Sequence, residues 1–441
     1  MTSTLITILL ILLVARINQK LFQIPVTLSL IALAYIVYHT FPETLHLEEH
    51  MFDETLLLLL PIILLPDILH LKVDDLKKYW KEITFLALIA VGVSIAIGTF
   101  ITPYLLPEYK FALGMLVALF SMIMATDAIT VTSIFGKFNL PHRLKLFAEG
   151  ESLFNDATGL IAYYFVGLPL LLGKDVTPFG IFLKLDEVFI FSTLIGVVIG
   201  FIGYYILKFL EDPIDEFIIM YVVALTAFLI AEHFHMAGIL SIISSVMTFS
   251  YFIDRDFEKW EKRIEKEHAK EFKKTPKRLH EILLEKLDFN YATTKERYEQ
   301  NKELSLIVGH FANAFLFISM AILVKPEVLL EYWKEILIVF IIITIVRAMM
   351  SFGFVGLFRY PARWGTALTL AGTRGGLSII MVHTLPHDFV YREMFEAIVV
   401  GVVVLTTFIY TFILLIFLKL KKEEFENDMK EEEKLLGNHN H

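Results

Sequence analysis

The 441-residue sequence contains no cysteine. Disulfide bonds, thiolate metal sites and cysteine nucleophiles are therefore excluded. Charged residues are also scarce, at 20% of the chain against 56% hydrophobic residues. The first apolar run has no basic segment before it and no clear small-residue cleavage motif, so we expect no cleavable signal peptide. The net charge of −9 says little about partners, because the charges collect in loops and in the tail.

Apolar runs long enough to cross a membrane recur along nearly the whole chain. A spanning helix needs about 20 apolar residues to cross a hydrocarbon core of about 30 Å. By this rule we predict an all-α polytopic membrane protein with about 13 transmembrane helices. The predicted spans are 3–22, 24–42, 54–70, 81–105, 110–135, 143–172, 187–210, 217–235, 236–253, 304–324, 333–358, 364–386 and 394–420.

Lys and Arg are unevenly distributed between alternate short loops. If the N-terminus lies outside, twelve of them fall in inside loops and six in outside loops. Cytoplasmic loops are enriched in basic residues, which predicts an external N-terminus and a cytoplasmic C-terminus. Residues 254–303 carry nearly equal numbers of acidic and basic residues and are expected to form a charged cytoplasmic helical hairpin interrupted at Pro276. The acidic tail from Lys419 is expected to be disordered.

A few ionisable residues lie inside the predicted spans, where charges are rare and usually face a polar cavity or a partner. They are Asp67, Asp127, Glu151, Asp156, Glu232, His310, Arg347 and Arg374. At a rise of about 1.5 Å per residue, Asp127 and Asp156 have similar depths near the midplane of consecutive antiparallel spans. Asp67 and Glu232 lie close to span ends, where snorkelling or helix-end packing is expected.

The stretch GESLFND, from Gly150 to Asp156, assigns faces of one helix. Residues four apart share a face, which gives two pairs: Glu151 with Asn155, and Ser152 with Asp156. The second pair is expected to meet Asp127 across the helix pair. The first pair requires a positive partner, for which Arg347 is the mid-membrane candidate. The alternative is one inert buried network, which apolar packing often replaces without loss of stability.

Several of the polar residues near Asp127 and Asp156 carry oxygen atoms that suit a bound cation. Hard cations such as Na⁺ prefer carboxylate, hydroxyl and carbonyl oxygens. The candidate ligands are Thr126, Asp127, Ser152 and Asp156, with the two carboxylates binding the Na⁺ charge. A carboxylate that holds either a proton or a cation, but not both, is an exchange site.

The segment LAGTRGGLS places Gly372, Gly375 and Gly376 around Arg374. Glycines of this kind permit a membrane helix to unwind where it lines a cavity. If the first six and last six spans are two halves, this span and the Asp127 span both hold fifth place. Interrupted helices at matching positions of inverted repeats predict a midplane site. We therefore expect two inverted six-helix repeats whose broken helices cross at the midplane.

Several of these segments together resemble the sodium/proton antiporters of the NhaP and NHE family. They are ATDAITVTSIF at 125–135, AEGESLFNDATG at 148–159, AEHFHMAGILSIISSV from Ala231, FANAFLFISMAIL from Phe311, Arg347, and AGTRGGLS from Ala371. The matches keep the family's order and cover nearly all of the membrane part. Ala128 departs from the family, which usually has proline there, and the 254–303 segment is longer than expected.

The resemblance implies a homodimer with a scaffold and a mobile core. It implies that Asp156 is the essential carboxylate for cation and proton, and that Thr126, Asp127 and Ser152 are accessory ligands. Glu151, Asn155 and Arg347 resemble a supporting network, and Arg374 resembles an arginine that offsets helix-end dipoles. The expected division is scaffold and dimerisation helices 1–80, first half of the transport core 81–172, linker and scaffold helices 173–253, charged loop 254–303, scaffold helix 304–332, second core half 333–420, and cytoplasmic tail 421–441.

The function that follows is electroneutral Na⁺/H⁺ antiport. A cytoplasmic cation would leave in exchange for an external proton by alternating access, across the cell (inner) membrane of a prokaryote. Asn155 cannot titrate, and relatives with Asn-Asp at this position resemble electroneutral exchangers. Alternatives are a K⁺/H⁺ exchanger on the same fold, an intramembrane aspartyl protease using Asp127 and Asp156, and a passive channel. We expect no enzymatic activity, cofactor or nucleic-acid partner; Li⁺ and K⁺ are further candidate cations, and the partners are membrane lipid and a second copy.

Overall fold

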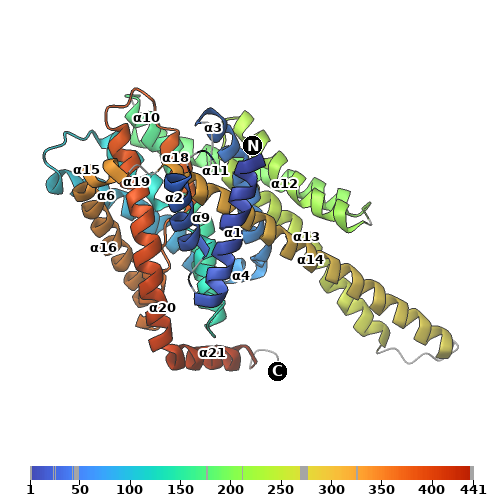
Figure 1. Cartoon of the computed structure of the whole chain (residues 1–441). Helices are drawn as coiled ribbons and strands as arrows, with labels where there is room; N and C mark the ends of the chain where they lie inside the picture. The colour runs from blue at the N-terminus through green and yellow to red at the C-terminus, as the bar shows by residue number, and fades with distance from the viewer. Residues whose placement is uncertain are drawn as a thin grey trace. The chain divides into compact units, whose positions relative to one another are not determined.

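The described part of the chain is almost entirely helical (Figure 1). The computed structural model describes residues 2–22, 24, 26–41, 43, 49–174, 177–210, 212–268, 277–323 and 326–437. Within these ranges the single β feature is an isolated antiparallel bridge between Thr126 and Arg374. The predicted all-α class is therefore confirmed for the described residues.

The chain divides into two compact units. The first comprises residues 1–60, 74–187 and 310–441, and the second comprises residues 61–73 and 188–309. Helices of the first unit are α1 (Thr2–Phe22), α2 (Val26–Thr40), α5 (Trp80–Thr84), η2 (Phe85–Ile89), α6 (Ala90–Leu105), α7 (Leu113–Met124), α8 (Ala128–Phe135), α9 (His142–Ala162), η3 (Tyr163–Gly167), α10 (Leu168–Leu171), α15 (Pro326–Glu331), α16 (Trp333–Phe358), α17 (Ala362–Leu370), α18 (Gly376–His383), α19 (Arg392–Leu405), η4 (Thr406–Tyr410), α20 (Thr411–Leu420) and α21 (Lys422–Gly437). Those of the second unit are α12 (Pro213–His233) and α13 (Gly238–His268). Divided between the units are α3 (Glu49–His70), α4 (Val73–Lys78), α11 (Pro178–Leu207) and α14 (Lys277–Leu323).

Membrane-spanning character is plainest in a subset of these helices. By length and apolar composition, five helical stretches of the described residues are able to cross a membrane: Trp80–Leu105, Phe179–Leu207, Pro213–His233, Trp333–Phe358 and Arg392–Leu420. Two of these stretches contain short π-helical segments that continue the α-helix, η2 and η4. Other predicted spans fall in further helices, some of them continuous, such as α1 and α13, and some interrupted, such as α7 with α8. The count of thirteen spans and the inverted repeat stay predictions.

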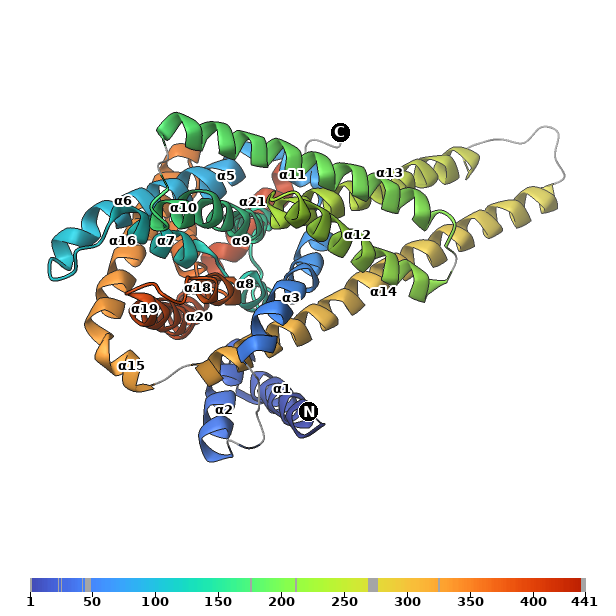
Figure 2. The ribbon, with the colours of Figure 1, turned by 90° about the horizontal axis from the view of Figure 1, so that it is seen from above.

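Two helices of the first unit are interrupted where the sequence predicts breaks. α7 ends at Met124 and α8 begins at Ala128, so the first break forms without a proline after Asp127. α17 ends at Leu370 and α18 begins at Gly376. The residues flanking the breaks, Ala125 and Gly375, have extended backbones. Seen from above, α7, α8, α9 and α18 lie side by side (Figure 2).

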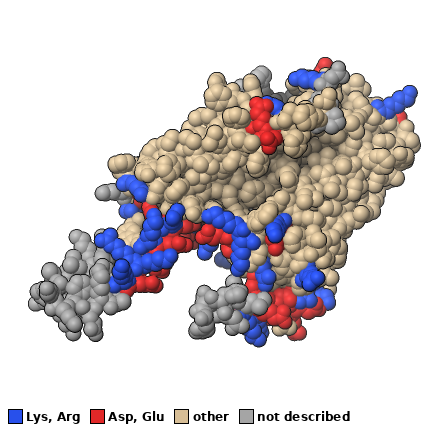
Figure 3. Space-filling view, turned by 180° about the vertical axis from the view of Figure 1, so that it is seen from behind, with Lys and Arg blue, Asp and Glu red and all other residues tan. Residues whose placement is uncertain are grey.

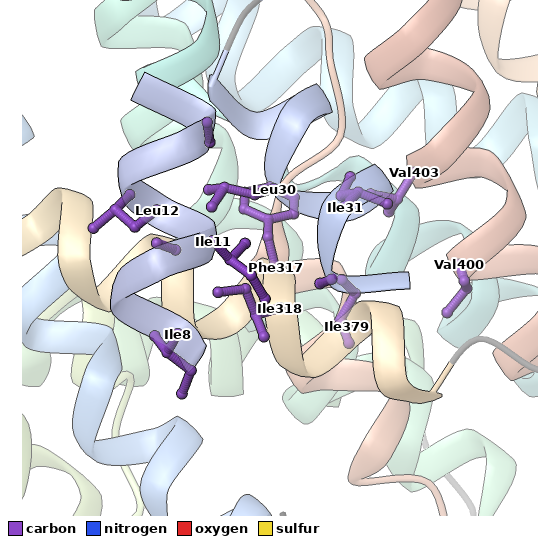
Figure 4. Close-up of a cluster of buried hydrophobic side chains, with 13 residues drawn as sticks. Ile8, Ile11, Leu12, Leu30, Ile31, Phe317, Ile318, Ile379, Val400 and Val403 are labelled. Atoms are coloured by element: carbon purple, nitrogen blue, oxygen red, sulfur yellow. The ribbon is translucent and has the colours of Figure 1, made fainter. Parts of the chain in front are cut away.

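A hydrophobic cluster joins the first two helices to the second broken helix (Figure 4). Its labelled members are Ile8, Ile11 and Leu12 of α1, Leu30 and Ile31 of α2, Phe317 and Ile318 of α14, Ile379 of α18, and Val400 and Val403 of α19. Between membrane helices such side chains stabilise a fold mainly through close van der Waals packing, because lipid is as apolar as they are. The proposed division into scaffold and moving core concerns motion, and it stays a prediction.

The charged 254–303 segment continues the helices on either side of it. α13 runs on to His268 and α14 begins at Lys277, while the predicted turn at Pro276 lies outside the described residues. Phe257 and Trp260 of α13 pack on Tyr291 of α14, with ring centroids 6.0 and 5.7 Å away. We call the part of α13 and α14 between residues 254 and 303 the arm. Figure 3 shows acidic and basic side chains gathered along the arm, with a second group over α21.

The base of the arm is held by buried polar contacts within the second unit. Asn301 is buried and donates to the carbonyl of Pro213 at 3.1 Å. Arg297 pairs with the buried Glu216 at 2.9 Å. These contacts tie the base of the arm into the second unit, so the base should be important for folding.

The expectation of a disordered tail is wrong for Lys422–Gly437, which form α21. Phe425, Asp428 and Glu432 are buried, and they share one face of this helix at spacings of three and four. The expectation of disorder rested on the acidic composition of the tail, which does not register that these three residues share one helix face. The helix is therefore stabilised by tertiary contacts that its acidic composition does not reveal.

Replacing residues 261–290 with a short Gly/Ser linker between Trp260 and Tyr291 should leave the melting temperature and transport near wild-type values. The reason is that the buried contacts at the base remain. Asn301→Ala is the contrast, since loss of its buried hydrogen bonds should cost about 1–3 kcal/mol. Melting in detergent and proton flux in vesicles measure both effects. Lost transport in a folded, shortened protein would show that the outer arm has a direct role.

Candidate ion-binding site

The two helix breaks pair with each other through their backbones. The amide of Asp127 donates to the carbonyl of Thr373 at 2.8 Å, and that of Gly375 donates to the carbonyl of Ala125 at 3.5 Å. These bonds produce the bridge between Thr126 and Arg374. Unpaired backbone groups in a lipid environment cost several kcal/mol each. Each break therefore satisfies polar groups that the other exposes. The two expected breaks lie against each other, while their crossing at the membrane midplane stays a prediction.

The Ser152–Asp156 face of α9 meets the first break. The amide of Thr126 donates to Asp156 Oδ1 at 2.9 Å, and Thr126 Oγ1 donates to Ser152 Oγ at 2.9 Å. Ser152 Oγ in turn donates to the carbonyl of Thr126 at 3.2 Å. All three residues are buried. Ser152 and Asp156 thus share one face of α9, and these hydrogen bonds join that face to Thr126. The expected meeting of this face with Asp127 stays a prediction.

Asp127 is buried beside a second pair of hydroxyl groups. Thr130, one turn further along α8, donates a short hydrogen bond to Asp127 Oδ2. Thr130 also shares a 2.7 Å hydrogen bond with Thr27 of α2. The sequence interpretation missed both threonines. The three-residue spacing from Asp127 is a local signal for Thr130, whereas only the tertiary structure brings Thr27 to the site.

A pocket of about 270 Å³ in the first unit reaches these hydroxyl groups. Thr27 and Thr130 form part of its wall, and the other lining residues are Arg16, Gln19, Val26, Ser133 and His310. Gln19 donates to Ser133 at 3.1 Å across it. His310, noted in the sequence as an ionisable residue within a span, therefore lines a polar pocket next to the Asp127 partners.

Glu151 and Arg347 form the predicted ion pair, with two parallel hydrogen bonds. Arg347 Nη1 and Nη2 donate to the two carboxylate oxygens at 2.9 and 2.8 Å, and the side chains are only 11% and 6% exposed. Asn155 Nδ2 donates to the same carboxylate at 3.3 Å. A bidentate pair adds geometric specificity to electrostatic attraction. Burial and bidentate contact together fix α9 against α16.

Arg347 also holds the end of α17. Its Nε donates to the carbonyl of Thr369 at 3.1 Å, and Nη2 donates to that of Leu368 at 3.0 Å. These carbonyls belong to the last turn of α17, where a positive charge is favourable. Gly372 provides the space, because a Cβ there would lie 1.8 Å from Arg347 Nε. Arg347 thus connects the helix carrying Asp156 to the second break.

Arg374 reaches back to the first broken helix. It is 2% exposed, and its Nη1 donates to the carbonyl of Met124, the last residue of α7, at 2.8 Å. Its own amide donates to Thr406 at 3.1 Å. A positive charge at a helix C-terminus offsets the partial negative charge there. The role of offsetting helix-end dipoles, which the family resemblance implies for Arg374, stays a prediction.

These residues form one connected group in the first unit, whereas Asp67 and Glu232 belong to the second unit and are not part of it. Paired helix breaks with buried oxygen ligands at their crossing are characteristic of a secondary ion transporter. Residues 5–275 and 282–420 match the family described as sodium/hydrogen exchanger, transmembrane. The chain belongs to this family, whose members are transporters and not enzymes.

Individual relatives are similar but distant. The chain is 24% identical to the Na⁺/H⁺ antiporter NhaG of Bacillus atrophaeus over 62% of its own length and 46% of NhaG. It is 24% identical to the Na⁺/H⁺ antiporter NhaH of Halobacillus dabanensis over 78% of each chain. The matched region is therefore less than half of NhaG. The structure of the sodium proton antiporter MjNhaP1 from Methanocaldococcus jannaschii at pH 8 has the same fold, with a TM-score of 0.69 at 15% identity, over 96% of this chain and 97% of that one.

Removing one partner of the Glu151–Arg347 pair should strongly destabilise the protein. Arg347→Ala leaves a buried carboxylate without its cation, a change that typically costs about 3–5 kcal/mol. Melting in detergent should therefore fall more for Arg347→Ala than for Asp156→Asn. The double variant Glu151→Gln/Arg347→Ala should recover part of this loss. Strictly additive losses would mean that the pair contributes no coupling energy.

Proposed function

We propose that this protein exchanges a cytoplasmic monovalent cation, chiefly Na⁺, for an external proton across a prokaryotic cell membrane. The observation that carries the proposal is the contact between Asp156 and the first break, where its carboxylate accepts a hydrogen bond from the amide of Thr126. A carboxylate held at a helix break is near backbone and hydroxyl oxygens that suit a hard cation. Family membership and the names of its relatives support the same reaction.

Exchange at this site follows from competition for one carboxylate. Asp156 binds a proton or, together with oxygens of Thr126, Ser152 and Asp127, binds Na⁺. Binding of one ligand removes the charge that attracts the other, so each turnover releases one ligand before the next binds. The pocket lined by Thr27, Thr130 and His310 supplies a polar approach to Asp127. Alternating access would then expose the site to each side in turn.

The supporting residues keep the site intact during this movement. Glu151, Asn155 and Arg347 hold α9 against α16 and α17, and Arg374 holds the two breaks together. We further propose a homodimer with an external N-terminus and a cytoplasmic C-terminus. The uneven distribution of basic residues between loops supports the orientation, and the dimer rests on the family resemblance.

K⁺/H⁺ exchange is the second candidate. The chain is 26% identical over 248 residues to a protein of Bacillus subtilis named sodium, potassium, lithium and rubidium/H⁺ antiporter. The same oxygen ligands serve several monovalent cations, and selectivity among them depends on the size of the site. Proton flux on adding Na⁺, K⁺ or Li⁺ separately distinguishes these substrates. The protease hypothesis is discarded, because the family is one of transporters.

Asp156→Asn should fold and yet give no cation-driven proton movement, because its amide cannot exchange a proton for a cation. Asp127→Asn should weaken the apparent Na⁺ affinity strongly, and Ser152→Ala should do so mildly because it removes a neutral ligand. Fluorescence-monitored proton flux in vesicles measures all three variants. Transport near the wild-type rate in Asp156→Asn would refute the role assigned to this carboxylate.

Exchange should be electroneutral, one Na⁺ for one H⁺. Asn155 does not titrate, and Glu151 is paired with Arg347. Asp127 and Asp156 are taken to act as one coupled pair, so the site changes by one charge when Na⁺ enters. Membrane potential, worth about 2.3 kcal/mol per charge per 100 mV, then does no work on the cycle. The measurement is exchange in proteoliposomes with valinomycin-imposed potentials of either sign. A transport current, or an exchange rate that changes when the sign of the potential is reversed, would implicate a second proton carrier.

A further inference from the structure

The C-terminal helix α21 buries carboxylates on the face that it turns toward the other helices of the first unit. Phe425, Asp428 and Glu432 are only 1%, 7% and 5% exposed. The ring of Phe425 lies 6.1 Å from that of Phe417 in α20. Acidic side chains are almost never buried unless they are paired. The partners of these two carboxylates therefore indicate what the helix does.

Asp428 binds the first turn of α17. Arg363 donates to both of its carboxylate oxygens, one bond being 2.8 Å and the other shorter. The indole Nε1 of Trp364 donates to Asp428 Oδ2 at 2.9 Å. α17 begins after Pro361, whose side chain makes no capping hydrogen bond. Asp428 thus places negative charge at a helix N-terminus that lacks a cap of its own, where such a charge is favourable.

Glu432 binds the first turn of α9 in the same way that Asp428 binds the first turn of α17. Glu432 Oε1 accepts hydrogen bonds from the backbone amide of Arg143 at 3.2 Å and from its Nε at 2.7 Å. α9 also begins after a proline, Pro141, with no side-chain cap. Glu432 therefore satisfies one of the free amides that every helix N-terminus presents. One face of α21 supplies carboxylates to two uncapped helices.

The two helices are those that carry the ion-pair network. Glu151 lies eight residues after Arg143 in α9, about 12 Å along the helix axis. Leu368 and Thr369, at the other end of α17 from Arg363, accept hydrogen bonds from Arg347. Between these levels, Tyr360 packs on Phe147 of α9 and on Trp364 of α17, with ring centroids 5.3 and 5.0 Å away. α9 and α17 are thus connected by α21 at their N-termini, by Tyr360 between Phe147 and Trp364, and by Arg347 at Glu151 and the last turn of α17.

We propose that Asp428 and Glu432 are positioning residues for ion exchange: together they fix α9 against α17 and thereby set the geometry at the crossed breaks. Each helix belongs to a different half of the expected transport core, so α21 links the halves from outside the membrane part. The inference about transport rests on the proposed function. The inference about geometry does not, because it concerns contacts within the first unit.

The test compares Asp428→Asn/Glu432→Gln with Glu433→Gln in the full chain. Glu433 is an exposed neighbour on the same helix, so the control removes a charge without touching the contacts. The double variant should raise the apparent KM for Na⁺ by about fivefold in proteoliposomes, with a smaller change in maximal rate. Glu432→Gln alone should give a milder defect than Glu432→Ala, because the glutamine oxygen is still able to accept a hydrogen bond from the amide of Arg143. The control should match wild type.

Hydrogen–deuterium exchange provides a readout that does not need transport. Amides at 124–127 and 371–376 should exchange severalfold faster in the double variant than in the control. Unchanged KM and unchanged amide exchange would overturn the proposal. So would a KM change that follows a general loss of melting temperature and is equally large in Glu432→Gln and Glu432→Ala. If wild-type protein moves no protons on Na⁺ addition, the proposed function fails, while amide exchange still decides whether α21 positions the breaks.

Discussion

The need to satisfy backbone groups where two helices stop inside the protein governs the rest of this structure. Each break exposes amides and carbonyls that lipid is unable to satisfy. The two breaks satisfy these groups by backbone hydrogen bonds to each other, from Asp127 to Thr373 and from Gly375 to Ala125. The crossing also brings opposite helix ends together, so that Arg374 from one break lies at the C-terminus of α7 in the other. The pairing of the two breaks therefore determines where the proposed ion ligands lie.

The buried charges follow from the same constraint. Replacing a buried ion pair with well-packed apolar residues is often neutral or stabilising, so overall stability alone is a weak reason to keep Glu151 and Arg347. Their geometry provides a better reason. Arg347 bonds Glu151 of α9 and two carbonyls of α17 at once, and Gly372 leaves room for it. The pair therefore sets relative helix positions that apolar packing would leave less well defined.

The same two helices are held again at their N-termini by α21. α9 and α17 both follow a proline and lack a side-chain cap, and Glu432 and Asp428 lie at those two ends. Capping, aromatic packing and the ion pair thus act at successive levels along one helix pair. A helix with acidic composition is ordered here because its carboxylates have partners, which explains why composition alone misjudges it.

Local spacing in the sequence determined much of the site. Four-residue separation put Ser152 with Asp156 and Glu151 with Asn155, and counting residues from span ends placed Arg347 at the right depth to pair with Glu151. The glycines around Arg374 predicted the second break, because glycine permits a membrane helix to unwind locally. Only the tertiary structure decided the other contacts: Thr27 with Thr130, Thr373 with Asp127, and α21 with α9 and α17. These join residues far apart in sequence, and no periodicity within one segment encodes which distant segment will lie against it.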